Sequence, residues 1–498
     1  MQDEDPVTAS HSVTLTSASG NPAEVGFEVG IDAAEPGSTS RTFTITGPDP
    51  AASARRTRKY RLPDTGHDAY LNFFEALAED FGTRVPQNRQ PPEAPASTAP
   101  FRSLLTQTLS PDILYGYGDP AVTRVVEGPA EARTASYYLV VTSNDAPQAF
   151  PILRSQDLTD WRLLGFVFPE GNTPRWAAQI GQGGEYWAPE MHQVGGKYLV
   201  CFAAREADHS FSIGLARSSR PDGPFSAGEE PILRGNVIDP HILVDRDDSA
   251  YLFWKEDTND LWPGRLCQLL HEHGQLAAEL FPGDEDRRTA AFDQTLWPWA
   301  QSLGPMERFF ILQGLVEAVV ADYPAFRERL AGLLGQQIDK AAQDAIAEVL
   351  RLTRTPVYAQ RLDPDGLVLI GERRQVLQND REWEGHLVEG VWVTEHQGRY
   401  YMLYAGNDFS TARYGIGVAV ADTPLGPYQK TEEPLLRSTV DWFGPGHPSV
   451  ADGPNGEPWL FLHAFFPSRS GYKEFRALLA LPIAFKEERI VMRPDLEA

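Results

Sequence analysis

The sequence predicts an all-β chain built mainly as a five-bladed β-propeller, with a helical insertion in the third blade and a small β-rich N-terminal appendage. Three observations carry this prediction. Short aromatic-rich strands alternate with turns over most of the 498 residues. A long motif occurs twice, as IGLARSSRPDGPFSAGEEPILR (213–234) and IGVAVADTPLGPYQKTEEPLLR (416–437). A weaker motif recurs five times after about residue 111, and such repeats are typical of radial β architectures.

The N-terminal part has a different pattern of predicted elements. Up to about residue 65 the runs SVTLTS, VGFEVGI and RTFTIT predict short strands between Gly, Pro and Asp turns. HDAYLNFFEALAEDF (67–81) predicts a helix, and VPQNRQPPEAPASTAP (85–100) predicts a linker or an extended crossing. We therefore expect an appendage with a Pro-rich linker over 1–100 and the propeller over 101–498.

In each copy of the weaker motif, a polar residue opens a strand and a turn then leads into an aromatic-rich strand. The five openings are GDPAV, APEMH, IDPHI, VEGVW and GHPSV. The strands that follow them are SYYLVVTS, KYLVCFAA, AYLFWKE, RYYMLYAG and PWLFLHA. In a propeller each opening would start an innermost strand and face the central channel. The residues expected to face this axis are Asp119, Glu190, Asp239, Glu389 and His447.

A helical stretch over 270–355 interrupts the third unit. FFILQGLVEAVVADYPAFRERLAGLL has apolar positions near period 3.6, and Pro324 is expected to kink or split that helix. DKAAQDAIAEVLRLTR predicts a further amphipathic helix. The insertion is a candidate for a lid over the channel or for an oligomer contact, and the oligomeric state is left open.

Composition limits the classes of partner and compartment. A net charge of −25 opposes binding to nucleic acid, which is itself a polyanion. The sequence contains no run of eighteen apolar residues, so it predicts no transmembrane helix. The N-terminus lacks the features of a signal peptide. We therefore expect no membrane partner and a cytoplasmic location, or a secreted one if a leader has been removed. Cys201 and Cys267 lie in apolar runs and are expected to be inert core thiols. A disulfide between them stays open, whereas a Cys-based metal site is not expected.

Three carboxylates are candidates for acid and base catalysis. Glu389 stands alone in the apolar run LVEGVWV, where an ionised side chain is expensive unless it is paired or functional. Asp119 and Asp239 precede prolines in two other blades, a setting in which Asp is more often a simple turn residue. If a radial fold brings the three together, they shift one another's pKa values and prepare an acid beside a base.

The motifs also resemble a known family. The relevant segments are DPAV (119–122), ILRSQDLTDW (152–161), YWAPEM (186–191), VIDPHILVD (237–245), WEGHLVEGVWV (383–393), the GPF and GPY ends of the long repeat, and GPGHPSV (444–450). In this order they resemble glycoside hydrolase family 43 over about 111–490, apart from the helical insertion. The resemblance implies a five-bladed propeller and inverting hydrolysis of arabinose- or xylose-containing glycans.

The resemblance also implies roles for the carboxylates. Asp119 matches the general base that activates water, Asp239 matches the carboxylate that orients the acid and tunes its pKa, and Glu389 matches the general acid. Inversion requires the acid and the base to be about 6.5–9.5 Å apart, so that a water molecule fits between base and sugar. The family motif more often reads EGP, whereas Val391 follows Gly390 here, so the local wall could differ.

Five further residues are candidates for substrate binding: Phe150, Trp187, Glu190, His447 and Arg476. The two aromatic residues could stack on a sugar or could equally lie between blades. Glu190 and Arg476 could instead be structural. His447 matches a channel histidine that contacts sugar or binds a central cation through water, so calcium in the channel is an expectation while no cofactor is required for the chemistry.

The sequence therefore predicts an exo-acting inverting glycosidase that acts on oligosaccharides, with α-L-arabinofuranosidase first. The alternatives are a β-xylosidase, a β-galactofuranosidase, a non-catalytic carbohydrate-binding propeller and an interaction scaffold. The related five-bladed inverting phosphorylases and retaining fructan hydrolases also stay in view, although GYGDPAV lacks the WMNDPNG-like motif of the fructan hydrolases.

Overall fold

The fold is that of a computed structural model. The structure describes residues 7–16, 22–32, 41–51, 54–62, 67–86, 99–127, 133–181, 183–259, 261–335, 339–467 and 469–493. Its contacts divide the chain into two compact units. The helical unit contains 1–90 and 258–354, and the five-sheet unit contains 91–257 and 355–498. Most of the linker predicted over 85–100 lies outside the described residues.

The five-sheet unit consists of antiparallel sheets in which each strand pairs with the next along the chain. The first sheet contains β6 (Ala121–Glu127), β7 (Thr134–Val140), β8 (Ala149–Ser155) and β9 (Arg162–Phe168). The second contains β10 (Tyr186–Val194), β11 (Lys197–Arg205), β12 (Phe211–Ser218) and β13 (Ser226–Ala227). The third contains β14 (Val237–Val244), β15 (Ala250–Glu256), β16 (Pro356–Leu362) and β17 (Leu369–Gln378). The fourth contains β18 (Val388–His396), β19 (Arg399–Gly406), β20 (Gly415–Ala421) and β21 (Gln429–Lys430). The fifth contains β22 (Phe443–Asp452), β23 (Pro458–Phe465), β24 (Arg476–Lys486) and β25 (Arg489–Met492), and β5 (Arg102–Leu105) also pairs with β24.

The first strands of the five sheets surround a common centre. They contact one another in the order β6, β10, β14, β18 and β22, and β22 contacts β6 in turn. Strands β7, β11, β15, β19 and β23 contain the aromatic-rich segments predicted to follow the five openings. The predicted dominance of β-structure is confirmed, and apolar side chains from neighbouring sheets form clusters between them.

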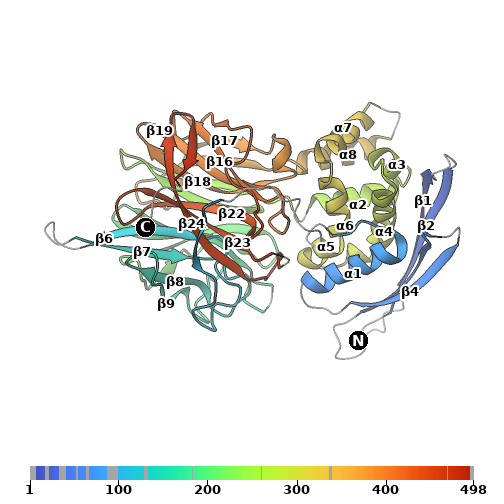
Figure 1. Cartoon of the computed structure of the whole chain (residues 1–498), viewed down its shortest axis with the longest axis horizontal. Helices are drawn as coiled ribbons and strands as arrows, with labels where there is room; N and C mark the ends of the chain where they lie inside the picture. The colour runs from blue at the N-terminus through green and yellow to red at the C-terminus, as the bar shows by residue number, and fades with distance from the viewer. Residues whose placement is uncertain are drawn as a thin grey trace. The chain divides into compact units, whose positions relative to one another are not determined.

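The helical unit combines the N-terminal strands with the helices that interrupt the third sheet (Figure 1). Its sheet contains β1 (Val7–Thr16), β2 (Pro22–Asp32), β3 (Arg41–Pro48) and β4 (Arg55–Leu62). Its helices are α1 (His67–Phe81), α2 (Trp262–Glu272), α3 (Leu276–Leu280), α4 (Asp284–Ala300), α5 (Pro305–Ile311), α6 (Gln313–Val320), α7 (Tyr323–Leu333) and α8 (Lys340–Leu352). Phe27 of β2 packs edge-on against Phe81 of α1 and Phe292 of α4, with ring centroids 5.7 and 5.6 Å away. The appendage and the insertion, predicted as separate pieces, thus share one core.

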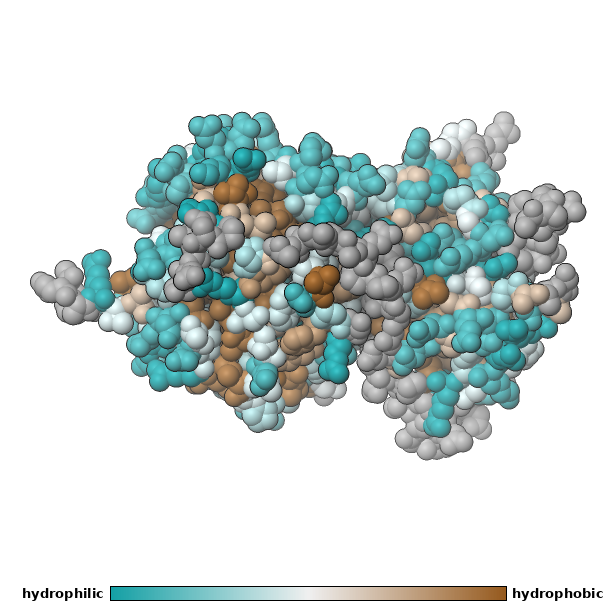
Figure 2. All heavy atoms as spheres, in the orientation of Figure 1, coloured by the Kyte–Doolittle hydropathy of each residue, from teal (hydrophilic) through white to brown (hydrophobic). Residues whose placement is uncertain are grey.

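The predicted break at Pro324 is confirmed, because α6 ends at Val320 and α7 begins at Tyr323 with the proline in its first turn. None of the described helices is long and apolar enough to cross a bilayer. On the face in view, apolar side chains gather over the strands of the five-sheet unit and hydrophilic ones surround them (Figure 2).

Candidate active site

A backbone irregularity positions the candidate residues. In β10, β14 and β18, the pairing with the next strand skips two residues near the beginning of the strand, which is a β-bulge. In β22 it skips two residues twice, at 444–445 and at 447–448. The first residue of each skipped pair has a left-handed backbone, and so does the residue that precedes Pro120 at the start of the first sheet. These residues, with their φ angles, are Asp119 (52°), Ala188 (44°), Asp239 (55°), Gly390 (56°), Gly444 (58°) and His447 (51°). Such backbone costs about 1–3 kcal/mol at a non-glycine residue and is concentrated at functional sites.

The bulges correct the alignment of the five openings. Asp119, Asp239 and His447 occupy equivalent positions, as predicted. Glu190 lies two residues after the equivalent Ala188, and Glu389 lies one residue before Gly390. Glu190 is therefore displaced into the next layer of side chains, whereas Glu389 stays beside the bulge.

Asp119 is held as a carboxylate by its neighbours. Its Oδ1 accepts a hydrogen bond from Arg476 Nη1 at 2.8 Å, and its Oδ2 accepts one from the Thr142 hydroxyl. The Nδ1 atoms of His447 and His463 lie 3.3 and 3.4 Å from Oδ1. Burial would raise the pKa of Asp119, but the Arg476 charge, both histidines and the Thr142 hydrogen bond together lower that pKa well below its usual value. Asp119 is therefore ionised near neutral pH.

The pKa of Glu389 is shifted in the opposite direction. Its Oε2 lies 3.1 Å from Lys255 Nζ, and its Oε1 accepts a hydrogen bond of 2.7 Å from the Tyr414 hydroxyl. Burial raises the pKa of Glu389, Lys255 opposes that rise, and the charge of Asp239 adds to it, so that the pKa stays above its usual value. Glu389 thus retains its proton to a higher pH than an ordinary glutamate.

A chain of contacts connects the three carboxylates. Asp239 Oδ2 accepts a hydrogen bond of 2.9 Å from the backbone N–H of Gly390, directly after Glu389. A Cβ atom on Gly390 would lie 2.9 Å from the His447 ring, so only glycine fits there. His447 in turn contacts Asp119. Three carboxylates are thus brought together from the first, third and fourth sheets, with the pKa of Asp119 lowered and that of Glu389 raised, an arrangement suited to paired base and acid catalysis.

The other predicted binding residues differ in their surroundings. Arg476 and His447 contact Asp119, as described above. Trp187 is partly exposed and packs on Phe211, with ring centroids 4.2 Å apart. Phe150 does not fit its predicted stacking role, because it is fully buried among aromatic side chains of the first and second sheets and presents no surface to a sugar.

Glu190 is separated from this cluster by its partners. Its Oε2 lies 2.8 Å from His192 Nε2 and 2.7 Å from His241 Nδ1, and its side chain is only 5% exposed. It contacts none of Asp119, Asp239 and Glu389 among the hydrogen bonds and ion pairs of the described residues. A role in substrate binding stays a prediction without support from these contacts.

Sequence reasoning missed four residues of the site: Thr142, Lys255, Tyr414 and His463. A signal existed for two of them. Lys255 in AYLFWKE and His463 in PWLFLHA are polar residues within apolar strands, the same feature that drew attention to Glu389. Thr142 and Tyr414 follow or precede strands in turn-like segments and carry no such signal.

The donors around His447 do not fit the expected calcium ion. Calcium takes about six to eight oxygen ligands. The nearest carboxylate oxygen, Asp119 Oδ1, already accepts a hydrogen bond from Arg476, whose positive charge opposes a cation there. In the part of the chain that the structure describes, the one group of three His, Cys, Asp or Glu side chains close enough to share an ion does not include His447. No step is derived from calcium.

The chain is similar to known glycoside hydrolases. The model described as glycosyl hydrolases family 43 matches residues 114–288 and 349–490. Xylosidase/arabinosidase 43A of Humicola insolens is 26% identical over 282 residues, which cover 56% of this chain and 66% of that protein. A β-xylosidase of Xylanibacter ruminicola is 22% identical over 285 residues, which cover 57% of this chain and 66% of that protein. The matches thus span just under two thirds of both relatives.

A structural comparison agrees in fold. The crystal structure of a thermostable family-43 glycoside hydrolase matches with a TM-score of 0.51 and 24% identity, and the match covers 76% of this chain and 93% of that one.

Proposed function

The chain belongs to glycosyl hydrolase family 43, and we propose that it is an exo-acting, inverting glycoside hydrolase that removes terminal pentose residues from oligosaccharides. The observation that supports this proposal best is the pair of opposite pKa shifts at Asp119 and Glu389, within one cluster that Asp239 completes. A carbohydrate-binding module or a scaffold would need neither an ionised base nor a protonated acid at its centre.

We propose a five-bladed β-propeller as the frame of this site. Five four-stranded units in chain order, first strands that contact one another in a ring, and the family-43 structural match support it. In that frame, the bulges turn residues from three blades toward one end of the central channel.

In the proposed reaction, Asp119 accepts a proton from water as the water attacks the anomeric carbon, and Glu389 gives its proton to the departing glycosidic oxygen. Arg476 and Thr142 keep Asp119 charged and oriented. Asp239 holds the backbone next to Glu389 and raises the pKa of that acid. Because the base works ionised and the acid works protonated, kcat/KM should be bell-shaped in pH, with Asp119 governing the acid limb and Glu389 the alkaline limb.

For the sugar, α-L-arabinofuranose is the first candidate and β-D-xylose the second. The two relatives favour both sugars, since one is a xylosidase/arabinosidase and the other a β-xylosidase. We expect hydrolysis of p-nitrophenyl α-L-arabinofuranoside or β-D-xyloside at least tenfold faster than of the β-D-galactofuranoside. Proton NMR of the first-formed sugar should show the inverted anomer. A retained anomer would overturn the mechanism, and no activity on any of the three glycosides would overturn the function.

Replacing Lys255 with Met should move the alkaline limb of kcat/KM to higher pH by about one unit or more, the effect of one neighbouring charge on a carboxyl. The lysine opposes the raised pKa of Glu389, so its removal lets that pKa rise further and keeps the acid protonated to higher pH. Lys430→Met is the matched control, because Lys430 is also buried against a glutamate, Glu384, at 2.7 Å. A limb that stays in place or moves to lower pH would contradict the assignment of Glu389.

A further inference from the structure

A second layer of polar side chains lies just beyond the bulges. The first paired residues after the skipped ones are Glu190 in β10, His241 in β14 and Trp392 in β18. Glu190 contacts His241, and the rings of His241 and Trp392 lie 4.7 Å apart. This layer takes no part in the proposed hydrolysis.

Strand geometry brings three donor atoms together on one face of the second sheet. Glu190 and His192 are two residues apart on β10, so their side chains point to the same face. Cys201 of β11 is the direct pairing partner of Glu190. A carboxylate oxygen of Glu190, a ring nitrogen of His192 and Cys201 Sγ all lie within 4.8 Å of one another.

His241 from the third sheet orients this set. Its Nδ1 lies 2.7 Å from Glu190 Oε2, and its Nε2 lies 3.0 Å from the backbone nitrogen and 3.1 Å from the carbonyl oxygen of Val393. Carboxylates that bind metals are themselves held by hydrogen bonds from outer partners, and His241 would be such a partner of Glu190.

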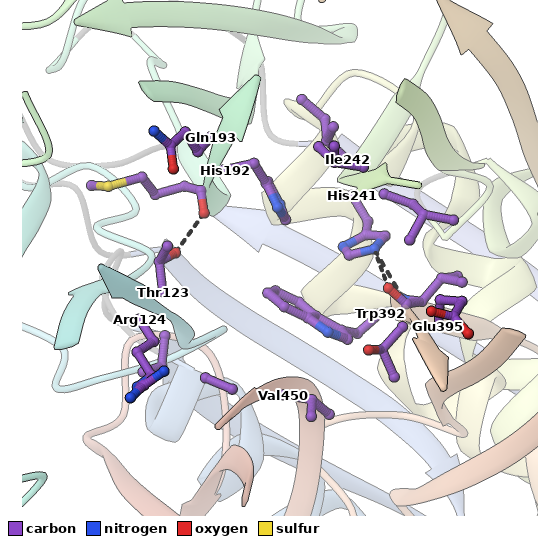
Figure 3. Close-up of a pocket in the computed structure, with 16 residues that line it drawn as sticks. Thr123, Arg124, His192, Gln193, His241, Ile242, Trp392, Glu395 and Val450 are labelled. Atoms are coloured by element: carbon purple, nitrogen blue, oxygen red, sulfur yellow. Dashed lines mark hydrogen bonds between the residues drawn. The ribbon is translucent and has the colours of Figure 1, made fainter. Parts of the chain in front are cut away.

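A pocket of about 350 Å³ reaches one member of the set, His192. It is lined by residues of all five first strands, among them His192, His241 and Trp392. Figure 3 shows these three side chains grouped together in the pocket, with Arg124 and Glu395 also on its wall. Solvent and small ions can therefore reach His192 without passing through the catalytic cluster.

We propose that Glu190, His192 and Cys201 bind one divalent transition-metal ion, with zinc as the best fit. Mixed oxygen, nitrogen and sulfur donors suit zinc, whereas calcium and magnesium prefer oxygen alone. Zinc bonds of about 2.0–2.3 Å place tetrahedral ligands roughly 3.3–3.7 Å apart, so small side-chain rotations suffice. A water molecule from the pocket would be the fourth ligand. Binding replaces the Cys201 thiol proton, which leaves to solvent, and puts the remaining ring proton of His192 on Nδ1.

The test uses the full chain after treatment with EDTA. Calorimetric titration with zinc chloride should give one equivalent bound, with much weaker binding of calcium and magnesium. Titration in buffers of different ionisation enthalpy should show proton release. Cobalt(II), used as a coloured substitute for zinc, should give a thiolate charge-transfer band in the near ultraviolet.

Three variants locate the site. His192→Gln and Cys201→Ser should each weaken zinc binding at least tenfold, and Cys201→Ser should abolish the thiolate band. His209→Gln is the control, because His209 is an exposed histidine outside the set. Circular dichroism and thermal melting establish whether each variant is folded. If a variant does not fold, the cobalt spectrum of the unaltered chain still tests the proposal.

Absence of zinc binding, absence of the thiolate band, or equal weakening by His209→Gln would overturn the proposal. These readouts do not use hydrolysis, so they are independent of the proposed activity.

Discussion

Replacing Asp119 with Asn should lower kcat by about 10²- to 10⁴-fold on every glycoside, including those with activated aryl leaving groups. Loss of the base affects the attack of water, a step that all substrates share. The amide can still accept a hydrogen bond from Arg476, whose side chain is only 10% exposed, so the site should stay assembled. Asp119→Ala would leave that charge without its partner, a loss that costs about 3–5 kcal/mol of folding stability at buried pairs.

Steady-state kinetics with aryl and natural leaving groups measures this effect. Asp245→Asn is a suitable control, because Asp245 follows the opposite end of β14 and accepts hydrogen bonds from Tyr400. Added azide, a nucleophile that needs no base, should restore turnover of an activated aryl glycoside by Asp119→Asn. Near-wild-type hydrolysis by Asp119→Asn without azide would show that another group activates the water.

The sequence patterns predicted most of the five-sheet unit because the same physical demand is repeated in it. Each second strand is buried on both faces, and segments such as KYLVCFAA show that burial as a continuous apolar run. The GPF and GPY repeat ends fall at corresponding positions of the second and fourth sheets. Repetition therefore located the sheets even though single strands carry weak signals.

The sequence did not predict which residues of the five openings occupy equivalent positions. The polar residues suggest one alignment of the five openings. The backbone instead aligns four of them on the residue before a proline. Asp119, Ala188, Asp239 and His447 each precede a proline, which cannot donate to the strand ladder and so fits a bulge. Alignment on proline places Glu190 two residues beyond the position of Asp119 and Asp239, which is where the structure has it.

Long-range partners were beyond sequence patterns. Lys255 contacts Glu389 across 134 positions and Arg476 contacts Asp119 across 357. Which buried charges meet is decided by the contacts between different sheets, not by local spacing. The same holds for the core shared by the N-terminal strands and the inserted helices, where Phe27 meets Phe292.

Replacing Glu389 with Gln should separate substrates by their leaving groups. Glycosides whose departing oxygen needs a proton should lose about 10²- to 10⁴-fold in kcat, the usual contribution of a general acid. Dinitrophenyl glycosides, whose leaving group departs as an anion, should retain activity within about tenfold. The alkaline limb of kcat/KM should also disappear, because the group that loses its proton there is gone.

The chain contains a closely matched control. Glu384 accepts a hydrogen bond from the Tyr404 hydroxyl at 2.7 Å and pairs with Lys430, as Glu389 does with Tyr414 and Lys255. Glu384→Gln therefore makes the same side-chain change in a similar buried setting, beside a tyrosine hydroxyl and a lysine, without touching the candidate acid. It should reduce thermal stability and leave the dependence on leaving group unchanged. If Glu389→Gln slowed all leaving groups equally, Glu389 would be a structural carboxylate, and the acid would have to be sought elsewhere in the cluster.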